Sequence, residues 1–211
     1  MNPSASPTPA VALFGGVFDP IHAGHLAVAR AACRRFHLDR VYFIPSGYPP
    51  HKASAKLTAF EHRYAMVALA CAGDRRFVPS LAEAGVSGRR HIFYTIDTVR
   101  QFRRKLAGTS TRLYFIAGAD AFRQIGTWKE YRRLLGACEF IVAHRPGFGL
   151  EQAAAGSIGE MAAGAMHLLR AVSSGVSSTE IRHRRQQGRS IRGLVPAPVE
   201  EYIEKQALYC E

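Results

Sequence analysis

The chain has 211 residues, which is enough for one domain with a substantial core and too few for two domains of ordinary size. Its composition, 47% hydrophobic and 21% charged, excludes a chain that is disordered throughout. The net charge of +12 favours a polyanionic partner, and nucleic acid, a membrane surface and phosphorylated small molecules all fit that description.

Neither a membrane span nor a cysteine framework is indicated. No stretch approaches the roughly 18 apolar residues of a transmembrane helix. The four cysteines lie far apart without CxxC spacing, which indicates neither a zinc cluster nor a disulfide scaffold and favours the reducing cytoplasm. Residues 1–10 lack the features of a secretion signal, so we predict a flexible tail there, followed by one domain over residues 11–211.

Strands and helices alternate along the chain. The hydrophobic pattern predicts strands over residues 11–14, 41–44, 77–79, 113–117, 140–143 and 167–172. It predicts helices over residues 23–36, 60–72, 94–106 and 128–135, from about residue 178, and over 199–206. This alternation predicts an α/β fold, a Rossmann-like doubly wound parallel sheet in a single domain with a small C-terminal helical part. Residues 147–164 favour a variable loop and helix.

The first motif, GGVFDPIHAGH over residues 15–25, joins the first strand to the first helix, where ligands bind in a parallel sheet. We expect Gly15 and Gly16 to let the backbone approach a ligand and to adopt positive φ. His22 and His25 stand at the helix start, where free N–H groups already attract anions, and can donate hydrogen bonds to phosphoryl oxygens. Two surface histidines on a turn are the alternative, which the full motif in this context makes a rare coincidence.

The second motif, VSSTEIR over residues 176–182, predicts another anion site at a helix start. Ser177 or Ser178 is a good N-cap, and hydroxyls together with free N–H groups can hold a phosphate. Arg182 follows within about a turn and can reach the same anion. Taken alone, the segment is explained better by an ordinary capped helix with solvated arginines, since Ser and Thr caps are common.

Together these motifs resemble the HxGH nucleotidyltransferase superfamily, whose SSTxIR motif the second segment matches. The resemblance covers about residues 12–209. It implies transfer of a nucleoside monophosphate to a phosphate by direct in-line attack, with Mg²⁺ accompanying the triphosphate and no protein metal site. It implies that ATP is bound by Gly15, Gly16, Phe18, His22, His25, Gly118, Asp120, Ser177, Ser178, Thr179 and Arg182.

Further segments resemble the bacterial nicotinate mononucleotide adenylyltransferases: PPHK at 49–52, YTIDT at 94–98, TW at 127–128 and RPG at 145–147. The resemblance implies that ATP adenylylates nicotinate mononucleotide, giving nicotinate adenine dinucleotide and pyrophosphate in NAD biosynthesis. It implies that His22, His25, Lys52 and Arg182 are catalytic. It implies that nicotinate mononucleotide is bound by Lys52, Thr95, Trp128 and Arg145.

Single residues of this set have simpler explanations. Lys52 is compatible with an exposed loop lysine, Asp120 with a plain helix N-cap, and Trp128 with a core aromatic. The helix motif around Glu61, Arg63 and Met66 resembles one of the same family and is predicted to be structural.

Lys129 departs from the family pattern, in which the residue after the tryptophan is often aromatic. The family implies that a neighbouring backbone amide helps to hold the nicotinate carboxylate. Lys129 either adds charge attraction there or points to solvent, and we expect solvent.

Two competing functions are a related transferase with another phosphorylated acceptor and a nucleic-acid-binding module. The second lacks a helix-turn-helix, RRM or zinc-finger signature. We expect ATP and nicotinate mononucleotide as partners, without nucleic acid or membrane, and the sequence leaves a homo-oligomer open.

Overall fold

The computed structural model describes residues 8–47, 57–85, 92–144, 165–170 and 175–210. Within these ranges six parallel strands form one sheet in the order β3-β2-β1-β4-β5-β6. The strands are β1 (Ala10–Gly16), β2 (Arg40–Pro45), β3 (Phe77–Pro79), β4 (Arg112–Gly118), β5 (Glu139–His144) and β6 (Met166–Arg170). This order reverses between β1 and β4, as in a doubly wound Rossmann-like sheet, so the predicted fold class is confirmed.

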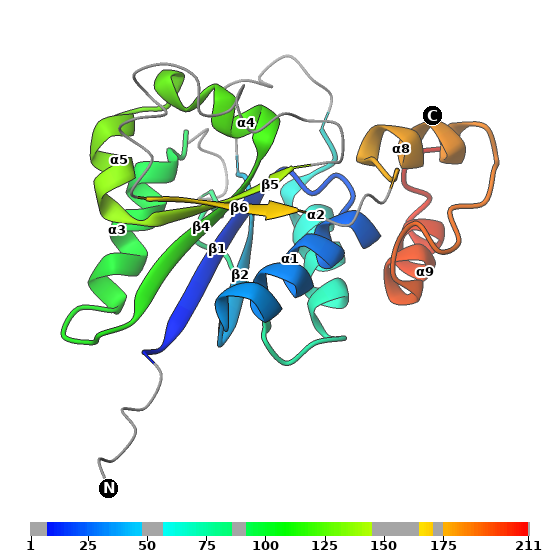
Figure 1. The fold of residues 1–211 in the computed structure, drawn as a ribbon. Helices are drawn as coiled ribbons and strands as arrows, with labels where there is room; N and C mark the ends of the chain where they lie inside the picture. The colour runs from blue at the N-terminus through cyan, green and yellow to red at the C-terminus, as the bar shows by residue number, and fades with distance from the viewer. Residues whose placement is uncertain (1–7, 48–56, 86–91, 145–164, 171–174, 211) are drawn as a thin grey trace, which may run out of the picture.

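Helices cover both faces of the sheet (Figure 1). One face carries α1 (Ala23–Phe36) and α2 (Phe60–Cys71), and the other carries α3 (Thr95–Lys105), α4 (Ala119–Arg123) and α5 (Tyr131–Ala137). A single 3-10 turn, η2 (Ile125–Thr127), joins α4 to α5. The predicted C-terminal helical part consists of α8 (Ser178–Gln186) and α9 (Ala197–Lys205), of which α9 packs against α2.

The strand sequences explain the two layers. Side chains of a strand alternate between the two faces of its sheet, so a strand covered on both faces is continuously apolar. In β1, Ala12 and Phe14 pack into the core of the α1 and α2 face, whereas Val11 and Leu13 pack into the core of the opposite face. All four side chains are buried, and β4 alternates in the same way.

The structure corrects two of the predicted boundaries. Ala10, which we placed in the N-terminal tail, begins β1, because its N–H donates to Asp39 Oδ2 and its C=O accepts from the Asp39 N–H, both at 2.8 Å. Trp128 does not begin a helix. Its backbone is extended, and α5 starts only at Tyr131, after Glu130 in the left-handed region at φ 51°.

The helix α4 was not predicted, because no loop signal separates it from the end of β4.

The described helices include none that is long and apolar enough to cross a membrane. All four cysteines carry free thiols, and Cys33, Cys71 and Cys138 are buried. Burial raises the pKa of Cys33 to about 11 and that of Cys71 and Cys138 to about 12. These three thiols therefore stay protonated and are poor nucleophiles near neutral pH.

Candidate active site

The turn between β1 and α1 is shaped by aromatic packing. Gly15 and Gly16 are the last residues of β1, and neither has positive φ, which corrects our expectation. A Cβ on Gly16 would lie 3.0 Å from the Phe18 ring, and one on Gly15 would lie 3.1 Å from Phe115. The glycines are therefore needed for close approach of neighbouring rings, while Phe18 itself takes the left-handed conformation at φ 50°.

The buried ring of Phe18 packs against His25, one of the two histidines of the first motif. Its side chain is 2% exposed and stacks edge-on against the rings of Phe14 and His25, with centroids 5.6 and 5.0 Å away. Because the ring is buried, only the backbone of Phe18 is placed to contact a nucleotide. Its side chain instead orients the imidazole of His25.

His22 and His25 form a stacked pair at the start of α1. His22 is the N-cap residue, and its backbone N–H donates to Nδ1 of His25 at 3.3 Å. The ring centroids are 3.7 Å apart at an interplanar angle of 30°. Since Nδ1 of His25 accepts a hydrogen bond, the neutral ring carries its proton on Nε2, where it can be donated.

The electrostatics keep His25 uncharged. Burial, and secondarily the neighbouring His22, lower the pKa of His25 well below its usual value. At neutral pH the residue is therefore a neutral hydrogen-bond donor rather than a cation.

This lowered pKa makes a prediction for stability. The unfolded chain binds a proton at His25 below pH about 6.5, whereas the folded chain does not until the lowered pKa is reached. Over that window the His25 contribution to the free energy of unfolding falls as the pH falls, by up to about 1.4 kcal/mol per pH unit. We expect urea unfolding at pH 7.5 and pH 5.5 to show a larger loss for the wild type than for His25→Asn.

His37→Asn is the matched control, because this exposed histidine lies at the opposite end of α1. It should lose stability between the two pH values as the wild type does. Equal losses in the wild type and His25→Asn would contradict the lowered pKa.

The second predicted anion site lies against the first. Ser177 is the N-cap of α8, and its Oγ accepts a hydrogen bond from the N–H of Glu180 at 3.1 Å. The Ser178 hydroxyl donates to the carbonyl oxygen of Pro20 at 2.9 Å. The start of α8 is thus fastened to the turn that leads into α1, 158 residues earlier in the chain.

Arg182 makes the second connection between these helix starts. Its guanidinium donates to the carbonyl oxygen of Asp19 at 2.7 Å and lies 3.4 Å from the hydroxyl of Thr179. The Asp19 carboxylate, 3% exposed, accepts from the Tyr209 hydroxyl at 2.7 Å and the Thr58 N–H at 3.3 Å. This buried carboxylate fixes the turn and is not available as a catalytic base.

A cavity of about 400 Å³ opens where the strand order reverses, at the carboxyl ends of β1 and β4. Its lining includes five of the predicted site residues: Gly15, Gly16, Thr95, Gly118 and Trp128. The Trp128 indole packs edge-on against Phe115, with centroids 6.0 Å apart, and faces the cavity as well. Trp128 is therefore both a packing residue and a candidate platform for a ring.

Seven other predicted site residues belong to the two helix starts and the turn before α1 and are not part of this lining: Phe18, His22, His25, Ser177, Ser178, Thr179 and Arg182. The remaining three are not placed at the cavity either. The Asp120 side chain is 86% exposed and pairs with Arg123 at 2.8 Å, outside the cavity lining. Lys52 and Arg145 lie outside the described residues, so their roles stay predictions, as does the ribose contact of Asp120.

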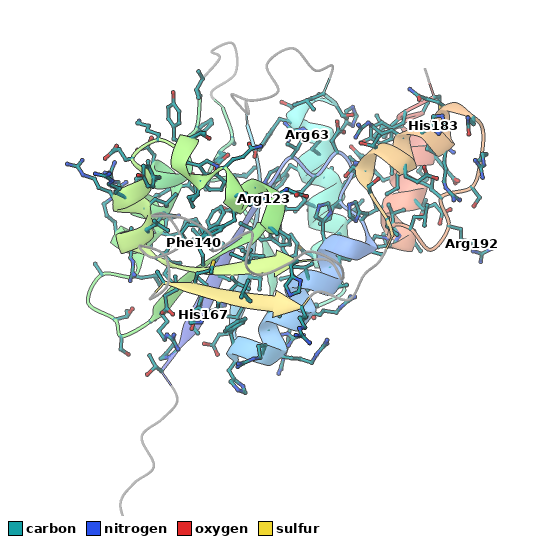
Figure 2. All side chains as sticks on the ribbon, turned by 45° about the horizontal axis from the view of Figure 1, so that its top comes forward. Arg63, Arg123, Phe140, His167, His183 and Arg192 are labelled. Carbon is teal, nitrogen blue, oxygen red and sulfur yellow. The ribbon has the colours of Figure 1, made fainter. Side chains whose placement is uncertain are left out.

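Arg63 was assigned to a structural helix motif, and the structure shows how it acts. This 2% exposed side chain, labelled on α2 in Figure 2, donates to four backbone carbonyls. The acceptors are Val17 (2.9 Å), Ser46 (2.8 Å), Gly47 (3.3 Å) and Thr58 (2.9 Å). One guanidinium thus ties together the loops after β1 and β2 and the start of α2, which border the site.

Sequence reasoning missed Glu83, which lines the cavity without belonging to a motif. Its Oε1 accepts a hydrogen bond from the Thr98 hydroxyl at 2.9 Å, and burial raises its pKa. A single acidic residue in a segment of loop carries no periodic signal, so only the tertiary structure reveals it.

Lys129 also lines the cavity, and its side chain is 42% exposed, so it combines contact with the cavity and the solvent exposure that we expected. Its ammonium lies 3.2 Å from Asp97 Oδ2 and 4.3 Å from the centroid of the Tyr94 ring. Both partners belong to the start of α3, a long-range contact that the sequence does not encode locally.

Known proteins resemble the chain over nearly its whole length. A family model described as cytidylyltransferase-like matches residues 13–184. A protein of Moorella thermoacetica named probable nicotinate-nucleotide adenylyltransferase is 44% identical, with 94% of this chain and 91% of the relative covered. A protein of the same name from Thermus thermophilus is 43% identical, with coverages of 94% and 98%.

Solved structures show the same fold. A Plasmodium falciparum nicotinic acid mononucleotide adenylyltransferase, described as complexed with NaAD, matches with a TM-score of 0.76 at 20% identity, covering 95% of this chain and 97% of that one. A putative nicotinate-nucleotide adenylyltransferase of Vibrio parahaemolyticus gives 0.67 at 16% identity, with 97% of both chains covered. The family model and the identity to the two curated relatives show that the chain is a nucleotidyltransferase of the nicotinate-nucleotide adenylyltransferase family.

Proposed function

We propose that this enzyme transfers the adenylyl group of ATP to nicotinate mononucleotide, releasing pyrophosphate and forming nicotinate adenine dinucleotide for NAD biosynthesis. The observation that carries the proposal is the junction of two helix starts beside one cavity. The Ser178 and Arg182 side chains donate hydrogen bonds to the turn before α1. The cavity opens at the carboxyl end of β1, which leads into this turn. The names of the curated relatives support the choice of acceptor.

The two parts of the site suit the two substrates. Helix starts attract polyphosphates through their free N–H groups and dipoles, so ATP is assigned to the starts of α1 and α8. The cavity between β1 and β4 has an aromatic wall that includes Trp128, and the Thr95 hydroxyl adds a polar group, so the pyridine nucleotide is assigned there. The strand end at Gly15 and Gly16 separates the two parts, and there the reacting phosphates meet.

The proposed reaction is one displacement. An oxygen of the 5′-phosphate of nicotinate mononucleotide bonds to the α-phosphorus of ATP, the bond to the bridging oxygen breaks, and pyrophosphate leaves towards α8. The attacking phosphate is already ionised, so no general base is needed. Neutral His25 donates its Nε2 proton in a hydrogen bond to a non-bridging oxygen, where charge gathers in the transition state. His22 holds that ring in place through its backbone N–H.

The proposed metal is Mg²⁺ carried by the triphosphate. Among the described residues no group of three or more His, Cys, Asp or Glu side chains could hold a metal ion. The groups at the two helix starts are hydroxyl, guanidinium and imidazole donors, which fit phosphate oxygens rather than a cation. Phosphate oxygens and water would therefore supply the ligands of such an ion, and its charge would offset that of the triphosphate.

Three further assignments complete the proposal. Lys52 and Arg145 contact nicotinate mononucleotide, and Asp120 contacts the ribose of ATP. The basic surplus steers anionic substrates rather than nucleic acid. The free thiols support a cytoplasmic location.

The test is an acceptor panel with purified enzyme, ATP and Mg²⁺, in which products are identified by mass. We expect nicotinate adenine dinucleotide and equimolar pyrophosphate with nicotinate mononucleotide, and much slower reaction with nicotinamide mononucleotide or phosphopantetheine. Faster adenylylation of another phosphorylated acceptor by the folded enzyme would overturn the assigned substrate.

A further inference from the structure

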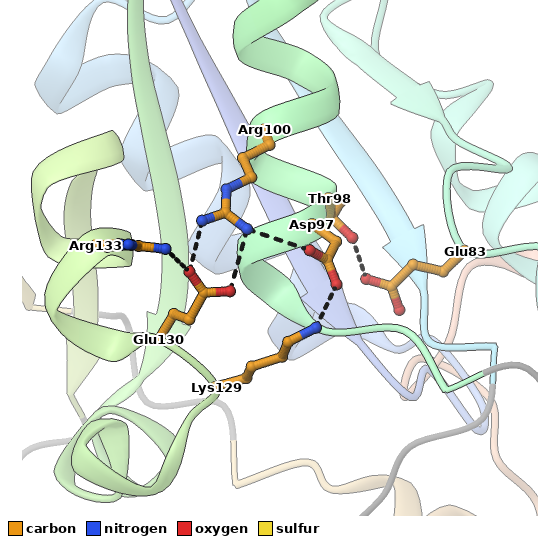
Figure 3. Close-up of polar contacts among 7 residues, drawn as sticks. All are labelled: Glu83, Asp97, Thr98, Arg100, Lys129, Glu130 and Arg133. Carbon is orange, nitrogen blue, oxygen red and sulfur yellow. Dashed lines mark hydrogen bonds and ion pairs between the residues drawn. The ribbon is translucent and has the colours of Figure 1, made fainter.

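Five charged side chains form one continuous series of ion pairs (Figure 3), and the Lys129 end of the series lines the cavity. Arg133 pairs with Glu130 at 2.7 Å, and Glu130 pairs with Arg100 at 2.7 Å. Arg100 then reaches Asp97 at 3.5 Å, and Asp97 reaches Lys129 at 3.2 Å. We call this series the ion-pair ladder. It joins the start of α3 to the segment between Trp128 and α5.

The ladder has an excess of positive charge. It alternates three cations with two anions, and its ends are the cations Arg133 and Lys129. Hydrogen bonds from Arg100 and Arg133 lower the pKa of Glu130 to about 2, so this anion stays ionised at physiological pH. Arg133 is 76% exposed and is not part of the cavity lining, whereas Lys129, 42% exposed, lines the cavity. The cation at the inner end is therefore the one that meets a bound ligand.

Lys129 is held in place and keeps hydrogen-bonding capacity. Asp97 and the Tyr94 ring fix the position of its ammonium, which has three N–H donors. One of them donates to Asp97 Oδ2 at 3.2 Å. Among the described residues that line the cavity Lys129 is the one cation, and Glu83 is the one anion. A ligand anion at this end of the cavity therefore gains most by lying against Lys129.

We infer that Lys129 determines specificity for the acid form of the substrate by contacting the carboxylate of the nicotinate ring. This inference rests on the proposed function. The 5′-phosphate of the substrate must lie near Gly15 and the start of α1, where adenylyl transfer occurs. The ring then lies against Trp128, a residue of the same lining that is next in the chain to Lys129. A carboxylate there accepts a charge-assisted hydrogen bond, whereas the neutral amide of nicotinamide mononucleotide gains much less.

The experiment compares kcat/KM for nicotinate mononucleotide and nicotinamide mononucleotide in the wild type, Lys129→Gln and Lys129→Arg. We expect Lys129→Gln to lower the value for the acid about tenfold, the effect of losing one hydrogen bond to a charged group, and to change the value for the amide less than about twofold. Lys129→Arg keeps the charge and should retain most of the acid preference. Added salt should weaken that preference in the wild type but much less in Lys129→Gln.

Lys105→Gln is a matched control. This lysine also lies over an aromatic ring, 5.1 Å from the centroid of Phe102, but at the far end of α3. We expect it to leave the ratio of the two kcat/KM values unchanged.

An equal loss with both substrates in Lys129→Gln, or no loss with either, would overturn the inference. Failure of the wild type to use nicotinate mononucleotide would instead refute the proposed function itself. The two failures are thus separable.

Discussion

We expect His25→Ala to lower kcat about 100- to 1,000-fold, with ATP affinity changed only severalfold. The imidazole donates to an oxygen whose negative charge grows in the transition state, and removal of one such preorganised donor costs about this much in other enzymes. Two observations suit His25 to this role. Its Nδ1 accepts from the His22 N–H, which leaves the proton on Nε2, and its lowered pKa keeps the ring neutral. Steady-state turnover measures kcat, and titration with an unreactive ATP analogue measures affinity.

Circular dichroism and thermal unfolding must show that the variant remains folded. His37→Asn, at the other end of α1, should retain wild-type turnover. Turnover of folded His25→Ala within about threefold of the wild type would contradict the proposed role of the imidazole.

Replacing Arg63 by methionine should lower the free energy of unfolding by about 3–5 kcal/mol. The substitution leaves four backbone carbonyl oxygens without the donors of this buried guanidinium and removes a cation that interacts with the buried carboxylate of Asp19. Those carbonyls lie in loops that border the site, so activity should fall even where the chain still folds. Urea unfolding gives the free energy, and turnover below the transition gives the activity.

Two variants sharpen this prediction. Arg63→Lys keeps the charge but lacks the planar fork, so it should recover little of the lost stability. Arg104→Met removes an exposed arginine of α3 and should change the free energy of unfolding by less than about 0.5 kcal/mol. If Arg63→Met lowers the free energy of unfolding no more than Arg104→Met does, the four hydrogen bonds of Arg63 to the loops contribute little to stability.

The fold was largely predictable because apolar periodicity reports on both faces of the sheet. The bounds of α1 and β3 agree with the prediction, and the other predicted strands and helices among the described residues are found within a few residues of their expected places. The loop and helix predicted over residues 147–164 lie outside the described residues. The helix α4 and the turn before α5 were missed, since short helices without clear caps leave little local signal. Ala10 joins β1 through hydrogen bonds to Asp39, a partner distant in sequence.

The site was predictable in its motifs but not in its mutual contacts. The sequence motifs located both helix starts, yet the Ser178 and Arg182 contacts that join them span more than 150 residues. The expectation of positive φ at Gly16 was wrong, and packing of the Phe18 ring is what requires a glycine there. The position of the Lys129 ammonium was not predictable, because it depends on Asp97 and Tyr94 at the start of another helix. Such tertiary contacts leave no periodic pattern in the sequence.

The stereochemical course of the reaction tests the central claim, that one direct displacement between two helix starts accomplishes adenylyl transfer. The enzyme is given ATP with a single chiral sulfur substitution at the α-phosphorus, together with nicotinate mononucleotide, and the configuration at that phosphorus is determined in the dinucleotide product. One in-line attack predicts inversion. Retention would show two successive displacements through a covalent adenylyl-enzyme, and would contradict the account.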